Sequence, residues 1–273
     1  MPRRVGIVHK VSSAEASETA LYAAQFLRSK GVDVVTDEPE VGRSADLVVV
    51  LGGDGTLIHA ARLLGGRRTP ILGVNMGNLG FMTEVPQGEL YPALERVLAG
   101  EGQFTERMKL RVHLHRGGRP ERDLDAEVLN DVVIGKGALA RMAELDARLG
   151  GDYVATYKAD GIIVATPTGS TAYSLAANGP IVYPTMRGVL LTPICPHTLT
   201  HRPLVFRPDA RLEIRNASDG PVTLTIDGQW GYELAGGASI EVRRAAQPLR
   251  VYRSPRGFFG ILREKFRWGE RQL

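Results

Sequence analysis

Short apolar runs alternate with helical patterns over the first hundred residues. Runs of strand length and aliphatic character occupy residues 5–8, 32–35, 47–51 and 70–74. The run at 47–51 is apolar throughout, which is typical of a strand covered on both faces. Strand and helix alternate repeatedly, so the pattern predicts an open parallel α/β sheet.

Two helices are expected between these strands. An apolar stripe follows Ser12, which forms a capping-box pattern with Glu15, and Gly31 ends this helix. A second stripe runs through 57–64 and stops at Gly65. Both patterns are those of helices that pack one face on a sheet.

The apolar period changes from helical to two beyond about residue 105. Apolar residues take every second position over 108–114 and again over 222–226, as in half-buried β-strands. One short helix is expected after Ser170. The second part of the chain is therefore predicted to be mainly β, and a length of 273 residues suits two domains with a boundary near Gly102.

The composition of the chain argues against several classes of function. The net charge of +4 favours small polyanions only weakly, and no cationic run is dense enough to predict nucleic-acid binding. A single cysteine, Cys195, excludes a disulfide framework and a multi-thiolate metal site, and we expect it in the core. No apolar stretch reaches signal-peptide or membrane-spanning length, so we expect a cytoplasmic protein without membrane association.

The sequence GGDGT at residues 52–56 lies where a buried strand should end and a helix begin. Ligands of open α/β sheets bind at this edge. The glycines permit unusual dihedrals and keep Cβ atoms away from an anion, while the helix adds its positive N-terminal end. The turn therefore predicts a phosphate site. Its candidate residues are Gly52, Gly53, Gly55 and Thr56.

Asp54 stands inside this predicted phosphate site. Its carboxylate could hold a divalent cation against the phosphates, or accept the proton of an attacking hydroxyl. The alternative is a tight turn in which Asp54 caps the helix. Neither the Walker pattern nor a GxGxxG turn after the first strand is present.

A second candidate follows Asp160. An apolar strand at 162–165 leads into a hydroxyl-rich loop at 166–174 that carries one aromatic residue, Tyr173. Short donors and acceptors beside a ring suit a nucleotide, and a helix cap rich in hydroxyl groups is the alternative. No GxSxG elbow supports a serine-hydrolase site.

The third candidate is the pair Asn130-Asp131, inside the apolar run 128–134 that we predict as one strand. Two polar side chains there are costly to bury unless something satisfies them. A bound ligand and a strand-end turn are equally compatible with the pattern. Asp227-Gly228-Gln229 follows another strand and, by itself, indicates a turn.

Together these segments resemble the NAD kinases, and the similarity runs from about residue 5 to about residue 260. The family's Asn-Glu pair is represented by Asn130-Asp131, with a shorter carboxylate. The other matching motifs are GGDGT at 52–56, the segments 73–75 and 78–81, ADG at 159–161, TPTGSTAYS at 166–174 and PHTL at 196–199.

The resemblance implies that ATP phosphorylates the 2′-hydroxyl on the adenosine ribose of NAD to give NADP. It implies a Rossmann-like α/β domain over 1–105, a β-sandwich-like domain over 106–252 and NAD in the cleft between them. Residues 253–273 would return to pack on the first domain. Asp54 would be the general base, and the glycine loop would hold the donor phosphates.

The resemblance also implies a set of NAD-binding residues and a divalent cation, Mg²⁺, whose ligands stay unknown. His59 and Arg141 lie on segments whose charges equally suit solvated surface. A homodimer or homotetramer is expected, with polyphosphate as the alternative donor and NADH as the alternative acceptor. The implied NAD-binding residues are Asp54, Gly55, His59, Asn130, Asp131, Arg141, Lys158, Asp160, Thr171, Ala172, Tyr173, Ser174, Leu175, Ala176 and Gln229.

Other classes fit the sequence less well. Lipid kinases and phosphofructokinases with similar glycine loops would not be expected to carry the 166–174 motif. A catalytically silent NAD-binding regulator would have lost Asp54 or the phosphate glycines. Glu264 and Glu270 interrupt the arginine-rich C-terminal segment, and its apolar residues at 258–262 predict a segment docked on a core rather than a nucleic-acid site.

Overall fold

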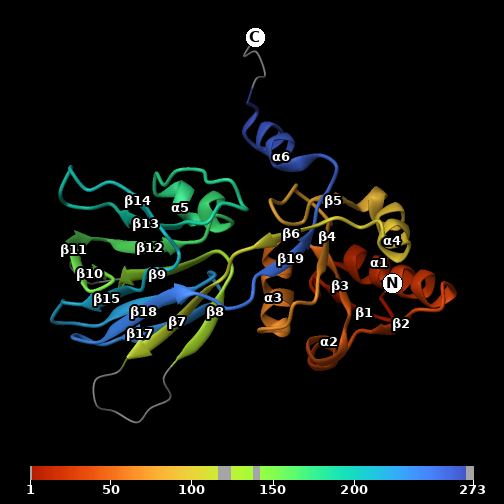
Figure 1. The fold of residues 1–273 in the computed structure, drawn as a ribbon, viewed down its shortest axis with the longest axis horizontal. Coiled ribbons are helices and arrows are strands. Elements are labelled where there is room, and N and C mark those ends of the chain that lie inside the picture. The colour runs from red at the N-terminus through yellow and green to blue at the C-terminus, as the bar shows by residue number, and fades with distance from the viewer. Residues whose placement is uncertain (1, 116–123, 138–141, 269–273) are drawn as a thin grey trace. The chain divides into compact units, whose positions relative to one another are not determined.

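The computed structural model describes residues 2–115, 124–137 and 142–268. Arg141, one of the expected NAD-binding residues, lies outside them. The chain forms two compact units, Met1–Glu106 with Gln247–Leu273, and Arg107–Ala246 (Figure 1). Every helix among the described residues is too short or too polar to span a membrane.

The first unit contains a twisted sheet with the strand order β2-β1-β3-β4-β19-β6, and β5 pairs with β4. Pairings β1–β2, β1–β3, β3–β4, β4–β5 and β4–β19 are all parallel, which confirms the predicted open α/β sheet. The strands are β1 (Arg4–His9), β2 (Asp33–Val35), β3 (Leu47–Gly52), β4 (Ile71–Asn75), β5 (Val85–Pro86), β6 (Phe104–Arg107) and β19 (Leu249–Tyr252).

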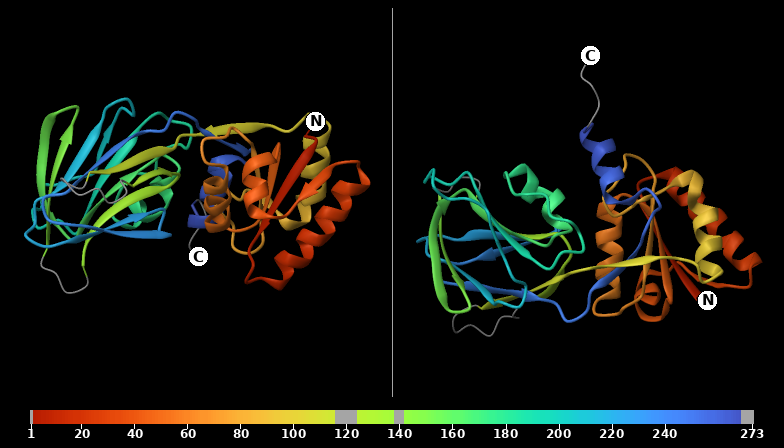
Figure 2. Two further views of the ribbon diagram at one scale, coloured as in Figure 1. Left: turned by 90° about the horizontal axis from the view of Figure 1, so that it is seen from below. Right: turned by 45° about the horizontal axis from the view of Figure 1, so that its top comes forward.

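Helices cover both faces of this sheet (Figure 2). Leu47, Val49 and Leu51 of β3 join a core with α1 and α4, while Val48 and Val50 are equally buried on the face packed by α2 and α3. β3 is therefore covered on both faces, as predicted. The helices are α1 (Ala14–Ser29), α2 (Glu38–Ser44), α3 (Asp54–Leu64), the short 3₁₀ helix η1 (Gln87–Glu89), α4 (Leu90–Leu98) and α6 (Gly257–Phe266).

The start of α1 corrects the predicted capping box. Ser13, not Ser12, is the N-cap residue, and its hydroxyl accepts a hydrogen bond from the backbone N–H of Ala16 at 3.2 Å. Ser13 has the extended backbone that a capping residue requires. Glu15 contributes as an acidic residue in the first turn, where the helix dipole favours it.

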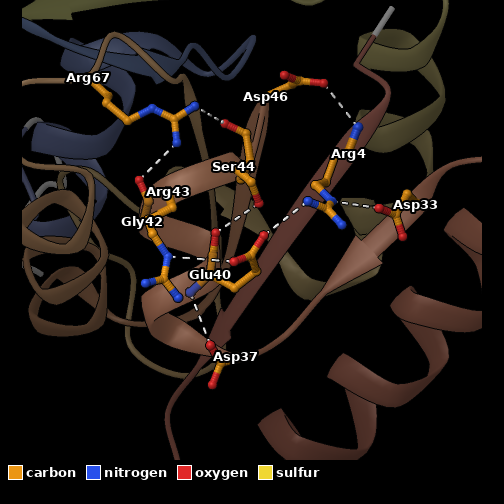
Figure 3. Close-up of polar contacts among 10 residues, drawn as sticks. Arg4, Asp33, Asp37, Glu40, Gly42, Arg43, Ser44, Asp46 and Arg67 are labelled. Carbon is orange, nitrogen blue, oxygen red and sulfur yellow. Dashed lines mark hydrogen bonds and ion pairs between the residues drawn. The ribbon is translucent and has the colours of Figure 1, made fainter.

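A network of ion pairs ties α2 to the amino edge of the sheet (Figure 3). Arg4, the first residue of β1, contacts Asp33 at 2.6 Å and Glu40 at 3.0 Å. Arg67 donates to the carbonyls of Gly42 and Ala45 at the end of α2. These partly exposed contacts fasten α2 at the edge opposite the glycine turn.

The second unit consists of two antiparallel six-stranded sheets, β11-β10-β15-β18-β7-β8 and β14-β13-β12-β9-β16-β17. Aliphatic side chains from both sheets form one core, so the unit is a β-sandwich, in agreement with the β-rich architecture expected for this part of the chain. The strands are β7 (Leu110–His115), β8 (Asp125–Val128), β9 (Asp131–Lys136), β10 (Ala143–Leu149), β11 (Asp152–Ala159), β12 (Gly161–Ala165), β13 (Val189–Ile194), β14 (Leu204–Phe206), β15 (Leu212–Asn216), β16 (Val222–Ile226), β17 (Trp230–Leu234) and β18 (Ser239–Arg244).

Two expectations for this unit are wrong. The run 128–134 is not one strand, because β8 ends at Val128 and β9 begins at Asp131 in the other sheet. Cys195 is exposed rather than in the core. It directly follows β13 with a φ of 43°, so the chain turns there and directs this side chain to solvent. The one short helix expected after Ser170 is present as α5 (Tyr173–Ala176), and the 3₁₀ helix η2 (Gly169–Thr171) precedes it.

Candidate functional site

The glycine turn lies at the carboxyl edge of the parallel sheet. β3 ends at Gly52, beside Asn75 at the end of β4, and α3 begins at Asp54. Gly53 between them is the N-cap residue of α3. This places the N-terminus of a helix at the edge where open α/β sheets bind ligands.

The glycines of this turn leave room for neighbouring atoms, and none of them adopts an unusual dihedral angle. This corrects that part of the prediction. Gly52, Gly53 and Gly55 all have negative φ. A Cβ at Gly52 would overlap the side chain of Thr56, whereas nothing lies within 4 Å of the Cβ positions of Gly53 and Gly55. Open space therefore adjoins the first turn of α3, where an anion would be favoured.

The Asp54 carboxylate is held by a loop rather than by its own helix. Its Oδ2 accepts a hydrogen bond from the N–H of Phe81 at 2.8 Å. Its Oδ1 accepts from the N–H groups of Met82 and Thr83, both at 3.0 Å, and from the Thr83 hydroxyl at 3.1 Å. Four donors thus fix the orientation of this carboxylate. Oδ2 accepts only one of these hydrogen bonds, so it keeps a lone pair available.

This loop, residues 76–84 between β4 and β5, is built around Asn75. The Asn75 amide donates to the carbonyl of Asn78 at 2.6 Å, and its oxygen accepts from the N–H of Gly77 at 2.9 Å. A Cβ at Gly80 would overlap the Asp54 carboxylate and the Thr83 hydroxyl. Sequence reasoning matched 73–75 and 78–81 to a family but gave them no role. Their role in the fold is to surround Asp54.

His59 projects from α3 into contacts with neighbouring charges. Its Nε2 lies 2.9 Å from Glu38 Oε1, and its Nδ1 lies 2.9 Å from Arg62 Nη2. Both ring nitrogens are therefore engaged within the first unit.

The second unit contains a pocket of about 390 Å³ at the start of β9. Such a volume suits part of a dinucleotide. Segments far apart in the sequence meet here, namely the start of β9, the turn into α5 and the β16–β17 hairpin. The lining residues are Asn130, Asp131, Val133, Ala172, Tyr173, Thr225, Asp227 and Gly228.

Asp227 organises one wall of this pocket. Asp227 and Gly228 have φ of 49° and 65°, and the N–H of Gln229 donates to the carbonyl of Ile226, so they form a left-handed hairpin turn. The Asp227 carboxylate accepts from the N–H groups of Leu129, Asn130 and Asp131 at 3.0, 2.7 and 3.2 Å. This is why the run 128–134 breaks, since its N–H groups turn to Asp227 instead of a neighbouring strand. Sequence reasoning missed this role, and the Asp-Gly turn signal was the available clue.

Asp131 has a shifted pKa in this pocket, and Asn130 has an unsatisfied hydrogen-bond acceptor there. Burial, with the nearby charge of Asp227, raises the pKa of the Asp131 carboxyl to about 7, although a backbone hydrogen bond from Tyr173 opposes this. The side-chain oxygen of Asn130 is buried and has no hydrogen-bond partner among the described residues. A buried acceptor without a donor costs about 1–3 kcal/mol, which a ligand that donates there would relieve.

The hydroxyl-rich loop contributes unequally to the pocket. Ala172 and the half-exposed Tyr173 line it. The Ser174 hydroxyl is buried and lies 3.0 Å from that of Thr192, and the Thr171 hydroxyl donates to the carbonyl of Thr168 at 3.2 Å. Leu175 and Ala176 complete α5.

The remaining expected residues do not line this pocket. Asp160 pairs with Lys136 at 2.7 Å, and Lys158 with Glu144 at 2.8 Å. Gln229 is exposed in the hairpin turn. Within the described part of the chain, His, Cys, Asp and Glu side chains form no cluster of three that could hold a metal ion.

Two family models match the chain. The ATP-NAD kinase N-terminal domain matches residues 38–102, and the ATP-NAD kinase C-terminal domain matches residues 129–254. Among relatives, the NAD kinase of Geotalea daltonii is 54% identical over 235 residues, covering 85% of this chain and 82% of that protein. The NAD kinase of Geobacter metallireducens is 53% identical over 253 residues, covering 92% and 88%.

Solved structures give the same picture of the fold. Yeast NADH kinase complexed with NADH superposes with a TM-score of 0.93 at 25% identity, covering 99% of this chain and 89% of that one. An NAD kinase from Archaeoglobus fulgidus in complex with ATP gives a TM-score of 0.80 at 24% identity, covering 95% and 98%.

Proposed function

The chain belongs to the NAD kinase family, and from this membership we infer that it transfers a phosphoryl group from ATP to the 2′-hydroxyl on the adenosine ribose of NAD, giving NADP. Phosphoryl transfer needs positioning and charge stabilisation, together with a group that accepts the proton of the attacking hydroxyl. The residues that supply these functions are our proposal.

Asp54 is the proposed general base, and the geometry of its carboxylate is the main support for this role. The carboxylate lies beside a helix N-terminus at the carboxyl edge of the sheet, with four hydrogen bonds to the 76–84 loop. It is thus oriented before substrate binds. Its less occupied oxygen, Oδ2, would accept the ribose proton.

The donor phosphates would lie against the glycine turn. The open space at Gly53 and Gly55 admits phosphate oxygens close to the backbone. The first turn of α3 supplies partial positive charge, and Gly52 and Thr56 complete the turn.

NAD would bind through the second unit. The unpartnered Asn130 oxygen and the Asp131 carboxyl offer acceptors to hydroxyl or amide groups of the dinucleotide, and Tyr173 offers a ring. The other described residues of this unit that we propose to bind NAD are Thr171, Ala172, Ser174, Leu175, Ala176, Gln229, Lys158 and Asp160.

A divalent cation, Mg²⁺, would neutralise charge on the transferred phosphoryl group. The described residues form no three-ligand cage, which suits Mg²⁺ because it commonly binds through substrate phosphates, water and one or two carboxylates. We propose that the ion arrives with ATP.

The protein is also proposed to form a homodimer or homotetramer. Support comes from the edge strand β14, where Leu204 and Val205 are exposed, because exposed apolar strand edges are typical of interfaces. Cytoplasmic location stays a prediction.

Formation of NADP from NAD, ATP and Mg²⁺ by the purified protein tests the function. EDTA should abolish it, and polyphosphate in place of ATP defines the donor. Absence of NADP, with phosphorylation of a lipid or sugar instead, would contradict the proposal.

A further inference from the structure

The C-terminal helix α6 lies against the loop that holds Asp54. The ring of Phe81 lies 6.3 Å from that of Phe258 and 5.9 Å from that of Phe266. Lys265 Nζ lies 4.8 Å from the centre of the Phe81 ring, and it also donates a hydrogen bond to the carbonyl of Leu79. Two segments of the first unit that are far apart in the sequence, with Lys265 and Leu79 separated by 186 residues, therefore meet at Phe81.

α6 is itself firmly attached to the first unit. Ile261 and Leu262 are buried. The chain leading into the helix is fixed where the N–H of Ser254 donates to Glu84 Oε2 at 3.0 Å. Glu84 ends the same 76–84 loop, so α6 and the loop are connected at two places.

Phe81 links α6 to the proposed base. Its ring contacts α6, while its backbone N–H donates to Asp54 Oδ2 at 2.8 Å. Its neighbours Met82 and Thr83 donate to Oδ1. A shift of Phe81 would therefore move donors on both oxygens of the carboxylate.

The amino-terminal part of the loop has little packing of its own. Gly77 and Asn78 are exposed and residues 76–84 contain neither helix nor strand, whereas Met82, Thr83 and Glu84 are buried. Loops of this kind open locally at little free-energy cost unless packed contacts oppose it. Misplacement of a reacting group by about 1 Å can reduce a rate by about 10²-fold, so a mobile loop would orient a base poorly.

We propose that α6 is a positioning element for phosphoryl transfer, in which Lys265 and Phe266 fix Phe81 and Phe81 orients the Asp54 carboxylate. The proposal rests on the proposed function, because orientation matters to the rate only if Asp54 takes part in the reaction. Lys265 and Phe266 are positioning residues, with no contact to the reacting atoms required.

The test is Lys265→Met, which keeps most of the aliphatic stem but removes the donor to Leu79 and the cation over Phe81. Arg263→Met is the matched control, since Arg263 is an exposed basic residue in the same last turn of α6. Lys265→Arg is the conservative variant, which retains a cation and a donor. Steady-state kinetics, thermal unfolding and amide hydrogen exchange are measured for each.

Lys265→Met should lower kcat by about 10-fold with KM for NAD and ATP nearly unchanged, because the base loses orientation while binding groups stay. Exchange at the amides of residues 81–83 should accelerate, and Lys265→Arg should recover much of both. Arg263→Met should match the wild type. Phe81→Leu, which removes the ring contacts from the loop side, should reproduce the kcat loss.

The proposal is overturned if Lys265→Met matches Arg263→Met in kcat and in exchange at 81–83. It is also overturned if the variant only lowers the melting temperature and the folded fraction turns over normally. If Lys265→Met does not fold, Phe81→Leu decides the matter on the same readouts. A fully active Asp54→Asn variant would instead refute the proposed base, while the exchange data would still report whether α6 holds the loop.

Discussion

Replacing Asp131 with asparagine should stabilise the protein at alkaline pH and leave it nearly unchanged at acidic pH. Burial and the charge of Asp227 raise the pKa of the Asp131 carboxyl from 3.8 to about 7. In the unfolded chain this carboxyl is exposed to water and has the pKa of an ordinary aspartate. Between these two values the folded protein retains a proton that the unfolded chain releases.

The sign and size of the effect follow from that difference. Because the folded state binds more protons, raising the pH through this window lowers the free energy of unfolding. The loss is about 1.36 kcal/mol for each pH unit over about three units, hence at most about 4 kcal/mol by pH 8. Asparagine carries no charge and still accepts from the N–H of Tyr173, so the variant avoids this loss.

Urea unfolding of both proteins between pH 4.5 and pH 8.5 measures the effect. The difference in the free energy of unfolding, variant minus wild type, should increase with pH and level off above about pH 7. Asp125→Asn is the control, because a hydrogen bond from Arg111 lowers the pKa of Asp125. Its stabilisation is lost only at pH values below the ordinary aspartate range, so the Asp125→Asn difference should stay constant between pH 4.5 and pH 8.5. A difference at Asp131 that does not change with pH would show that its carboxyl titrates alike in the folded and unfolded protein.

Three further outcomes are expected. Gly80→Ala should reduce kcat by about 10²-fold, because the added Cβ would displace the Asp54 carboxylate; steady-state kinetics on folded protein checks it. Asp227→Ala should lower the free energy of unfolding by about 2–4 kcal/mol in urea, because three backbone N–H groups lose their acceptor, and Asp227→Asn should lose less. Asp160→Ala should weaken NAD binding by about 1–3 kcal/mol in titration calorimetry without a matching change in melting temperature, because the contact that we propose with NAD would be lost; normal binding would instead assign Asp160 to its ion pair with Lys136.

Local patterns predicted the layers of the fold well. The uniformly apolar run of β3 predicted a strand covered on both faces, and the structure places Val49 and Val48 on opposite sides of the sheet. Alternation over 222–226 likewise predicted β16. Such features depend on side chains a few positions apart, which a single sequence displays directly.

Contacts across long sequence separations were not predictable in the same way. The break at Leu129 depends on Asp227, which lies 98 residues further along the chain. Asp54 was singled out by its glycine neighbours, but the donors that orient it come from residues 81–83. Cysteine is a residue type that is usually buried, but Cys195 is exposed because the chain turns there. Tertiary context decided each case.

The role of Asp54 in the reaction is tested by measuring kcat of Asp54→Asn across a Mg²⁺ titration. The substitution keeps the shape and one acceptor oxygen for the N–H groups of Met82 and Thr83, but it replaces Oδ2, the proposed proton acceptor, by an amide nitrogen that cannot accept from Phe81. A fall in kcat of about 10²–10⁴-fold is expected, with NAD affinity and fold preserved and no recovery at high Mg²⁺. Partial recovery at high Mg²⁺ would assign Asp54 to the metal instead, because mass action restores a weakened site. A near wild-type kcat at every Mg²⁺ concentration would show that Asp54 takes no part in the reaction.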